Sequence, residues 1–174
     1  HNVMNTDFVV GVSDKATNNL NLIFNTKIGQ EYLSLKKGFG KNFIRRLPDF
    51  GFSAIANIIA SIKLAKQMSL GKDDAIITVA TDGADLYLSE LNKTKENFKG
   101  IYDETTCAEI FGQYLKGIAT DNTLELNQKE KERIFNLGYY TWVEQQGIDI
   151  QEFEKRRNQT FWNEQYNYML SLDN

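Results

Sequence analysis

The sequence predicts an α/β protein, with part of a parallel-sheet three-layer domain followed by a helical C-terminal extension. Three features indicate this fold class. Residues 7–12 and 75–80 are short, solidly apolar runs, as expected for strands buried on both faces of a parallel sheet. An amphipathic helix pattern over residues 52–69 leads into the second run. The last third of the chain has a helical pattern throughout.

Composition limits the classes of partner. The chain has 174 residues, 41% of them hydrophobic and 25% charged, which is typical of one soluble globular domain. Its net charge of −3 gives no electrostatic support for nucleic-acid binding. No apolar run reaches the roughly 18 residues that span a bilayer, and no signal peptide is visible. We therefore expect neither a nucleic acid nor a membrane as partner, and a cytoplasmic location.

Two unique residues restrict the chemistry. Cys107 is the only cysteine, so an internal disulfide is impossible and a reducing compartment is expected. It falls within a predicted helix, where a small buried residue is favoured over a nucleophile. His1, the only histidine, stands at the chain terminus. A Ser-His-Asp or Cys-His mechanism and a zinc site of His and Cys ligands are therefore unsupported, and we assign no catalytic or metal-binding residue.

The elements before residue 70 follow from capping and periodicity. Ser13 and Asp14 are expected to cap a helix after the first strand, because short polar side chains accept hydrogen bonds from free amides. A second helix is predicted over residues 27–37, ending near Gly38, and then a short helix and a loop. In the helix over residues 52–69 the isoleucines recur on one face. The lysines Lys63 and Lys66 are expected to be solvated on the other face.

Further along, the strand over residues 75–80 ends in Thr81-Asp82-Gly83. Helices are predicted at 84–95, 105–118 and 128–146, the last ended by Gly147, with one or two more over residues 151–172. The many aromatic side chains after residue 138 are expected to pack in a core or form an interface. Two strands alone do not make a stable parallel sheet, and the chain opens on His1, so we expect a piece of a longer protein.

Two interpretations of Asp82 remain open. In the first, its side chain caps the following helix, with Asp85 three residues on as in a capping box. In the second, it contacts a ligand, because ligands of open α/β sheets lie beyond the carboxyl ends of the strands.

The segments around Asp82 resemble pyridoxal-phosphate enzymes of fold type II, the tryptophan-synthase-β fold, nearest to the cysteine synthase group. That group has a Gly-Ile-Ser-Ser-Gly-Ala turn that opens a helix, then a strand, then Pro-Ser-x-Gly-Glu-Arg-Tyr-Leu-Ser. The sequence here has Gly-Phe-Ser-Ala-Ile-Ala over residues 51–56 and Thr-Asp-Gly-Ala-Asp-Leu-Tyr-Leu-Ser over residues 81–89. Residues 1–7 and 138–147 also resemble segments of the group, the latter in its C-terminal extension.

The resemblance implies site residues and a cofactor. Asp82 stands where the family has a serine that contacts the pyridine nitrogen of pyridoxal 5'-phosphate. An aspartate there would favour the protonated ring, because an opposite charge stabilises the charged form. Ser53 matches the first serine of the helix-opening turn and is expected near the site wall. Tyr87 and Ser89 match the motif in either a structural or a functional role.

The family's Schiff-base lysine, substrate loop and glycine-rich phosphate cradle are not found in this sequence. The resemblance therefore implies residues 1–100 as the C-terminal part of the enzyme's α/β domain and residues 101–174 as a helical extension. It implies β-elimination or β-replacement on a serine- or cysteine-like amino acid, a homodimer, and a lysine from a missing N-terminal half of the same protein. The isolated chain would be inactive. The alternative is a non-catalytic helical interaction module; a nucleotide-binding α/β domain lacks a supporting phosphate loop.

Overall fold

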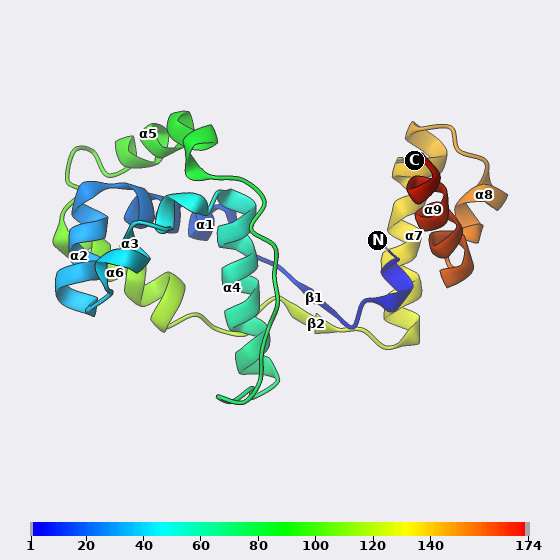
Figure 1. Cartoon of the computed structure of the whole chain (residues 1–174), viewed down its shortest axis with the longest axis horizontal. Coiled ribbons are helices and arrows are strands. Elements are labelled where there is room, and N and C mark those ends of the chain that lie inside the picture. Colours follow the sequence, from blue (N-terminus) through cyan, green and yellow to red (C-terminus); the bar gives the residue numbers. More distant parts are fainter. Residues whose placement is uncertain (1, 173–174) are drawn as a thin grey trace. The chain divides into compact units, whose positions relative to one another are not determined.

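The computed structural model describes residues 2–172, which form two compact units (Figure 1). The larger unit comprises residues 10–123. The smaller unit comprises residues 2–9 together with residues 124–172. The chain therefore passes from one unit to the other twice.

The larger unit is built from helices. In chain order they are α1 (Asp14–Asn25), α2 (Lys27–Lys37), α3 (Lys41–Ile44), the 3₁₀ turn η2 (Leu47–Asp49), α4 (Phe52–Gln67), the 3₁₀ turn η3 (Ala84–Tyr87), α5 (Leu88–Glu96), α6 (Glu104–Phe111) and the π-helical turn η4 (Gly112–Lys116). These bounds confirm the helices that the sequence predicts before residue 70. They divide the helices predicted at 84–95 and 105–118 into two parts each.

Helix α1 occupies the centre of the larger unit and packs against α2, α4, α5 and α6. Its side chains Leu20, Leu22 and Ile23 are fully buried, and Ile55 and Ile59 of α4 join them in one apolar core. Burying a side chain of this size contributes about 1.5–3 kcal/mol. The core is thus made mainly by helices, and Tyr102, from the segment before α6, is also buried in it.

Local capping sets the bounds of the first two helices. The Ser13 hydroxyl accepts a hydrogen bond from the Ala16 amide at 3.2 Å, as expected for an N-cap. Thr26 ends α1 and caps α2 through the Gly29 amide. Gly38 ends α2 with φ of +72°, a left-handed conformation that glycine adopts without steric cost.

The smaller unit holds the 3₁₀ turn η1 (Val3–Asn5), α7 (Gln128–Tyr139), the π-helical turn η5 (Tyr140–Gln145), α8 (Ile150–Lys155) and α9 (Gln159–Leu172). Phe135 and Phe153 are buried with their ring centroids 4.7 Å apart. The expected aromatic packing is confirmed for this pair. No residue of α9 is buried, however, and Tyr166 and Tyr168 are exposed.

A two-stranded sheet, β1 (Phe8–Val10) with β2 (Thr123–Glu125), lies where the chain crosses between the units. Its strands are antiparallel. The Gly11 amide donates to the Asn122 carbonyl and the Leu126 amide donates to the Asp7 carbonyl. The predicted fold class, an α/β protein with part of a parallel-sheet three-layer domain, is therefore wrong for the described residues, which are 66% helical. No apolar run in the sequence predicts the short strand β2.

The predicted strand over residues 75–80 accounts for most of this error. These residues form neither helix nor sheet, and all of them are exposed. Apolar, β-branched residues indicate a strand only if neighbouring strands are present to pair with it. The described part of the chain supplies none beside this segment.

Within residues 2–172, no single helix is both long and apolar enough to cross a lipid bilayer. The segment Lys41–Asp49 and helix α4 pass that test together on length and composition only, and they are bent by 117°.

The junction of α1 and α2 yields the first prediction. A Cβ atom on Gly29 would lie 2.1 Å from the Ile23 carbonyl oxygen, which is backbone and cannot move aside. Gly29→Ala is expected to lower the free energy of unfolding by about 3 kcal/mol, the upper range for overpacking. Urea denaturation measures this change.

Gly112→Ala is the matched control. Gly112 is helical, with φ of −61°, and a Cβ atom there meets no other atom within 4 Å. Alanine should raise the free energy of unfolding by about 0.5–1 kcal/mol, because it restricts the unfolded chain. Equal effects of the two substitutions would contradict the close packing at Gly29.

Candidate functional site

The two motifs that carry the family resemblance meet in the larger unit. The Gly51 amide, at the start of α4, donates to the Asp82 carbonyl at 2.7 Å. The Asp82 carboxylate accepts hydrogen bonds from the Tyr87 and Thr81 hydroxyls. The N-cap of η3 is Gly83 and has no side-chain hydrogen bond. The capping interpretation of Asp82 is therefore wrong, and the carboxylate is held by two hydroxyl groups instead.

Close packing at Gly51 holds this arrangement together. A Cβ atom on Gly51 would lie 2.6 Å from Asp82 Oδ1 and 2.9 Å from a ring carbon of Tyr87. The adjacent Phe52 ring stacks on the Tyr87 ring with centroids 4.4 Å apart. Only glycine leaves room for both the carboxylate and the aromatic pair at this point.

Hydrogen bonding keeps the Asp82 carboxylate ionised. The Tyr87 hydroxyl, followed by the Thr81 hydroxyl, lowers the pKa of Asp82 below its ordinary value, because both stabilise the charged form. The same contact raises the pKa of Tyr87, so the phenol remains protonated and continues to donate. The arrangement is a fixed negative charge beside an aromatic pair, suited to contact a cationic or protonated group.

Ser53 lies elsewhere. Its side chain is exposed and lines a cavity of about 380 Å³ together with Asp14 and Glu90. Asp82 is not among the residues that line this cavity. The structure thus does not bring Ser53 and Asp82 into one cavity. The two carboxylates at the cavity also make it unsuited to a phosphate group. Ser89 is exposed.

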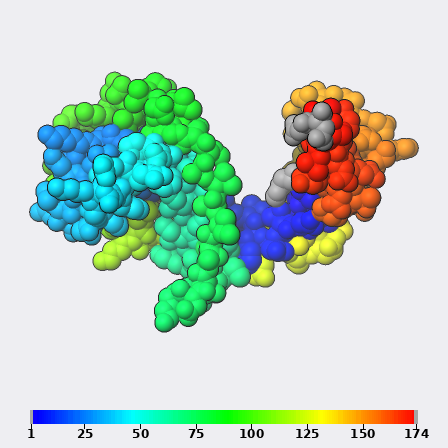
Figure 2. Space-filling model, in the orientation of Figure 1, coloured from blue at the N-terminus to red at the C-terminus, as the bar shows by residue number. Residues whose placement is uncertain are grey.

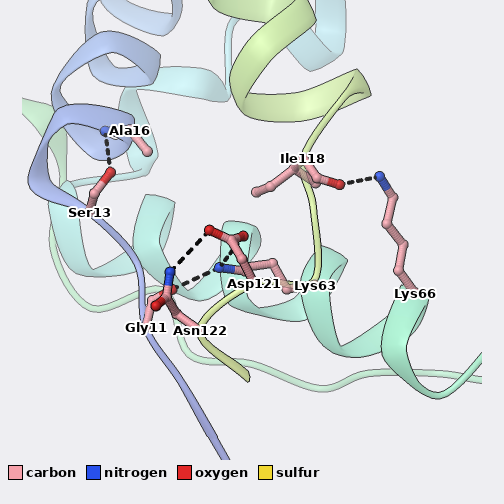
Figure 3. Close-up of polar contacts among 8 residues, drawn as sticks. All are labelled: Gly11, Ser13, Ala16, Lys63, Lys66, Ile118, Asp121 and Asn122. Carbon is pink, nitrogen blue, oxygen red and sulfur yellow. Dashed lines mark hydrogen bonds and ion pairs between the residues drawn. The ribbon is translucent and has the colours of Figure 1, made fainter. Parts of the chain in front are cut away.

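Lys63 forms a second polar cluster in the larger unit (Figure 3). Its Nζ atom donates to the Gly11 carbonyl at 3.0 Å and pairs with the Asp121 carboxylate at 3.2 Å. Lys63 is only 4% exposed, so the expectation of a solvated lysine is wrong. The contacts tie α4 to the end of β1 and to the segment before β2.

The sequence held a signal for this burial. Ile55, Ile59 and Lys63 are spaced by four residues, which places all three on one face of α4. Lys66 is exposed as expected and donates to the Ile118 carbonyl at 2.6 Å (Figure 3).

Cys107 is a structural residue, as predicted. It is fully buried, and its thiol contacts the Tyr102 hydroxyl, which also receives a hydrogen bond from Thr26. Burial raises the pKa values of both Cys107 and Tyr102. A thiol so protonated is a poor nucleophile. His1 lies outside the described residues.

In the part of the chain that the structure describes, no group of three or more His, Cys, Asp or Glu side chains is placed to hold a metal ion. Comparison with family models, curated proteins and solved structures finds no match to this chain.

The hydroxyl contact at Asp82 gives a pH prediction. Tyr87→Phe removes the hydroxyl group that lowers the pKa of Asp82 the most, so this pKa should rise toward its ordinary value. Because the pKa of Asp82 is depressed in the folded protein, the ionised carboxylate stabilises the fold at pH values above the pKa that Asp82 has in the unfolded state. This stabilisation is lost as the pH falls through the folded-state pKa. The variant should lose less stability on acidification than the wild type.

Carbon NMR of the Asp82 carboxyl, followed across acidic pH, measures the pKa directly. Tyr140→Phe, which removes an exposed hydroxyl in the smaller unit, should leave the Asp82 titration unchanged. An unaltered titration in Tyr87→Phe would show that this hydroxyl does not hold the carboxylate.

The Lys63 cluster gives a stability prediction. Lys63→Met keeps the aliphatic stem but removes the contacts to Gly11 and Asp121. It should lower the free energy of unfolding by about 1.5–3 kcal/mol, the range for hydrogen bonds to charged groups. In urea denaturation Lys95→Met, at an exposed position of α5, should cost less than about 0.5 kcal/mol. Equal losses would argue against a special role for the buried lysine.

Proposed function

We propose that this chain is the C-terminal fragment of a pyridoxal-phosphate-dependent enzyme of amino-acid metabolism. The reaction is β-elimination or β-replacement on a serine- or cysteine-like amino acid, as in cysteine synthase. One observation carries the proposal. The two motifs of the resemblance, distant in sequence, are joined by the hydrogen bond from the Gly51 amide to the Asp82 carbonyl. This joint positions an ionised carboxylate beside an aromatic pair.

Asp82 suits one contact with the cofactor. Pyridoxal phosphate, when bound, withdraws electrons from the α-carbon of an amino-acid substrate through its ring. The Asp82 carboxylate would hold a proton at the ring nitrogen, because an adjacent negative charge favours the protonated form. Tyr87 would act as a positioning residue that orients this carboxylate.

The other parts of the site would come from the N-terminal half of the same protein. Among the described residues Lys63 is the one buried lysine, and its Nζ atom is engaged by Gly11 and Asp121. An amine that is engaged by a carbonyl and a carboxylate in this way is not free to act as a nucleophile. The cavity at Ser53 carries Asp14 and Glu90 without a cation, so the phosphate group would be bound elsewhere. The isolated chain should therefore be inactive.

The proposal includes a homodimer in the cytoplasm, in keeping with the single, buried thiol of Cys107. A second candidate function is a non-catalytic helical interaction module. The exposed tyrosines of α9 and the exposed side chains of residues 75–80 favour it, because exposed apolar surface often marks a protein interface.

Nitrogen NMR with ring-labelled pyridoxal phosphate tests the proposal on the full-length gene product. The wild type should bind the cofactor with its ring nitrogen protonated. In Asp82→Asn the ratio of protonated to neutral ring nitrogen at neutral pH should fall by about ten- to a thousandfold, because a nearby opposite charge shifts a pKa by 1–3 units. The rate of β-elimination should fall with it.

Asp85→Asn is the matched control. Asp85 lies three residues away, is exposed, and has no hydrogen bond to the Asp82 carboxylate, so its ring-nitrogen signal should equal that of the wild type. After borohydride reduction, mass spectrometry should find the modified lysine outside residues 1–174. A gene product that binds no cofactor would favour the interaction module instead.

A further inference from the structure

A cavity of about 570 Å³ in the larger unit has no role in the site described above. It is lined by residues of α1, of α5 and the turn after it, of α6 and of η4, and Asp82 is not among them. Helices α5 and α6 both pack against α1. Helix α5 is an outer element of this unit, in green along its upper edge in Figure 2, and only its Thr94 side chain is buried. A cavity of this size is typical of a site for a small molecule.

Carboxamide side chains dominate the lining of this cavity. Within residues 2–172 none of the four makes a side-chain hydrogen bond: Asn18, Asn19, Asn97 and Gln113. Three of them are exposed or partly exposed, but Asn19 is only 8% exposed. Buried polar side chains are nearly always hydrogen-bonded, because an unpaired polar group is costly away from water. Asn19 therefore has an unused donor and acceptor at the wall of the cavity, which suits it to bind a ligand.

The position of Asn19 in α1 places it at this wall. Lys15, Asn18 and Asn19 are spaced by three and four residues, so they share one face of the helix, and all three line the cavity. The neighbouring face carries Leu20 and Ile23, which are fully buried in the apolar core. An apolar side chain at position 19 would serve the packing of α1 better than a carboxamide does. A ligand accounts for the asparagine, whereas the fold alone does not.

Two opposite charges also line the cavity. Lys15 comes from α1 and Glu109 from α6, and both side chains are exposed. In the described part of the chain neither side chain forms an ion pair or a hydrogen bond. One positive and one negative group are thus free at the same cavity, and together they complement a molecule that carries both an anionic and a cationic group. A free α-amino acid has these two groups, a carboxylate and an ammonium, on one carbon atom.

We propose that this cavity binds a free α-amino acid with an uncharged polar side chain. The Lys15 ammonium pairs with the α-carboxylate, and the Glu109 carboxylate pairs with the α-ammonium. The side chain of the amino acid enters the cavity, where the Asn19 carboxamide offers both a donor and an acceptor to its hydroxyl or carboxamide group. An apolar side chain would leave the Asn19 carboxamide unpaired, and a site built for hydrogen bonds rejects such a ligand. This site is separate from Asp82 and needs no cofactor, so the inference goes beyond the proposed function.

Isothermal titration calorimetry of the 174-residue chain, without pyridoxal phosphate, tests the proposal. At least one of L-serine, L-threonine, L-asparagine and L-glutamine should bind with a dissociation constant in the millimolar range or below. L-valine should bind at least about tenfold more weakly, because it offers no hydrogen bond to Asn19. The α-amide of the amino acid that binds best lacks the carboxylate, so it should bind about two- to fivefold more weakly than the acid.

Variants of the lining residues separate binding from stability. Asn19→Leu keeps a side chain of similar size but removes the carboxamide. It should weaken binding about ten- to a hundredfold, yet unfold at the same or a higher urea concentration, because the lost group has no partner in the fold. Lys15→Met and Glu109→Gln should each weaken binding about two- to fivefold, the range for an exposed ion pair. Glu96→Gln, which changes an exposed carboxylate of α5 outside the cavity lining, should bind like the wild type.

Three results would each overturn the proposal: no binding of any of the four polar amino acids, equally tight binding of L-valine, or wild-type affinity in Asn19→Leu. If Asn19→Leu does not fold, the exposed variants Lys15→Met and Glu109→Gln decide the matter, and wild-type affinity in both would overturn it. The cofactor proposal is tested by the ring-nitrogen signal at Asp82, so either proposal can fail without the other.

Discussion

Burial of helix α1 is the constraint on which the larger unit depends. The helix packs against α2, α4, α5 and α6, and its side chains Leu20, Leu22 and Ile23 are fully buried. Once α1 is placed, α4 is fixed through Ile55 and Ile59, and the start of α4 carries Gly51. The amide of Gly51 then fixes Asp82. The candidate site is thus positioned by a core that lies several contacts away from it.

Two polar features are placed by this core in different ways. The Asp82 carboxylate is bound by hydroxyl groups and remains available to a ligand, because a carboxylate accepts more hydrogen bonds than it receives here. The Lys63 side chain is engaged by its own partners and ties α4 to the end of β1 and to the segment before β2. Asp82 lies beside the start of α4, and Lys63 lies toward the end of that helix. Of the two, only Asp82 has the accessibility that a binding role requires.

The sequence predicted the helices well, because their signals are local. Ser13, Thr26 and Gly38 mark helix ends through contacts with residues three to five positions away. The error over residues 75–80 has the opposite cause, since a strand depends on partners that its own sequence does not contain. The sequence drew attention to Asp82, whose cofactor contact stays a prediction, whereas its hydrogen bonds with Thr81 and Tyr87 were not predicted. The spacing of four residues between Ile59 and Lys63 predicts that Lys63 is buried. The positive charge of Lys63 led to the opposite prediction, a solvated side chain.

The two crossings of the chain between its units have a consequence for synthesis on the ribosome. The larger unit is continuous from residue 10 to residue 123, so it can fold as soon as that stretch has emerged. Residues 2–9 emerge earlier but belong with residues 124–172. They cannot join their own unit until residues 124–172 have been synthesised. Residues 2–9 are therefore made before the larger unit yet reach their native place after it, and a product truncated before residue 124 would leave them exposed to chaperones.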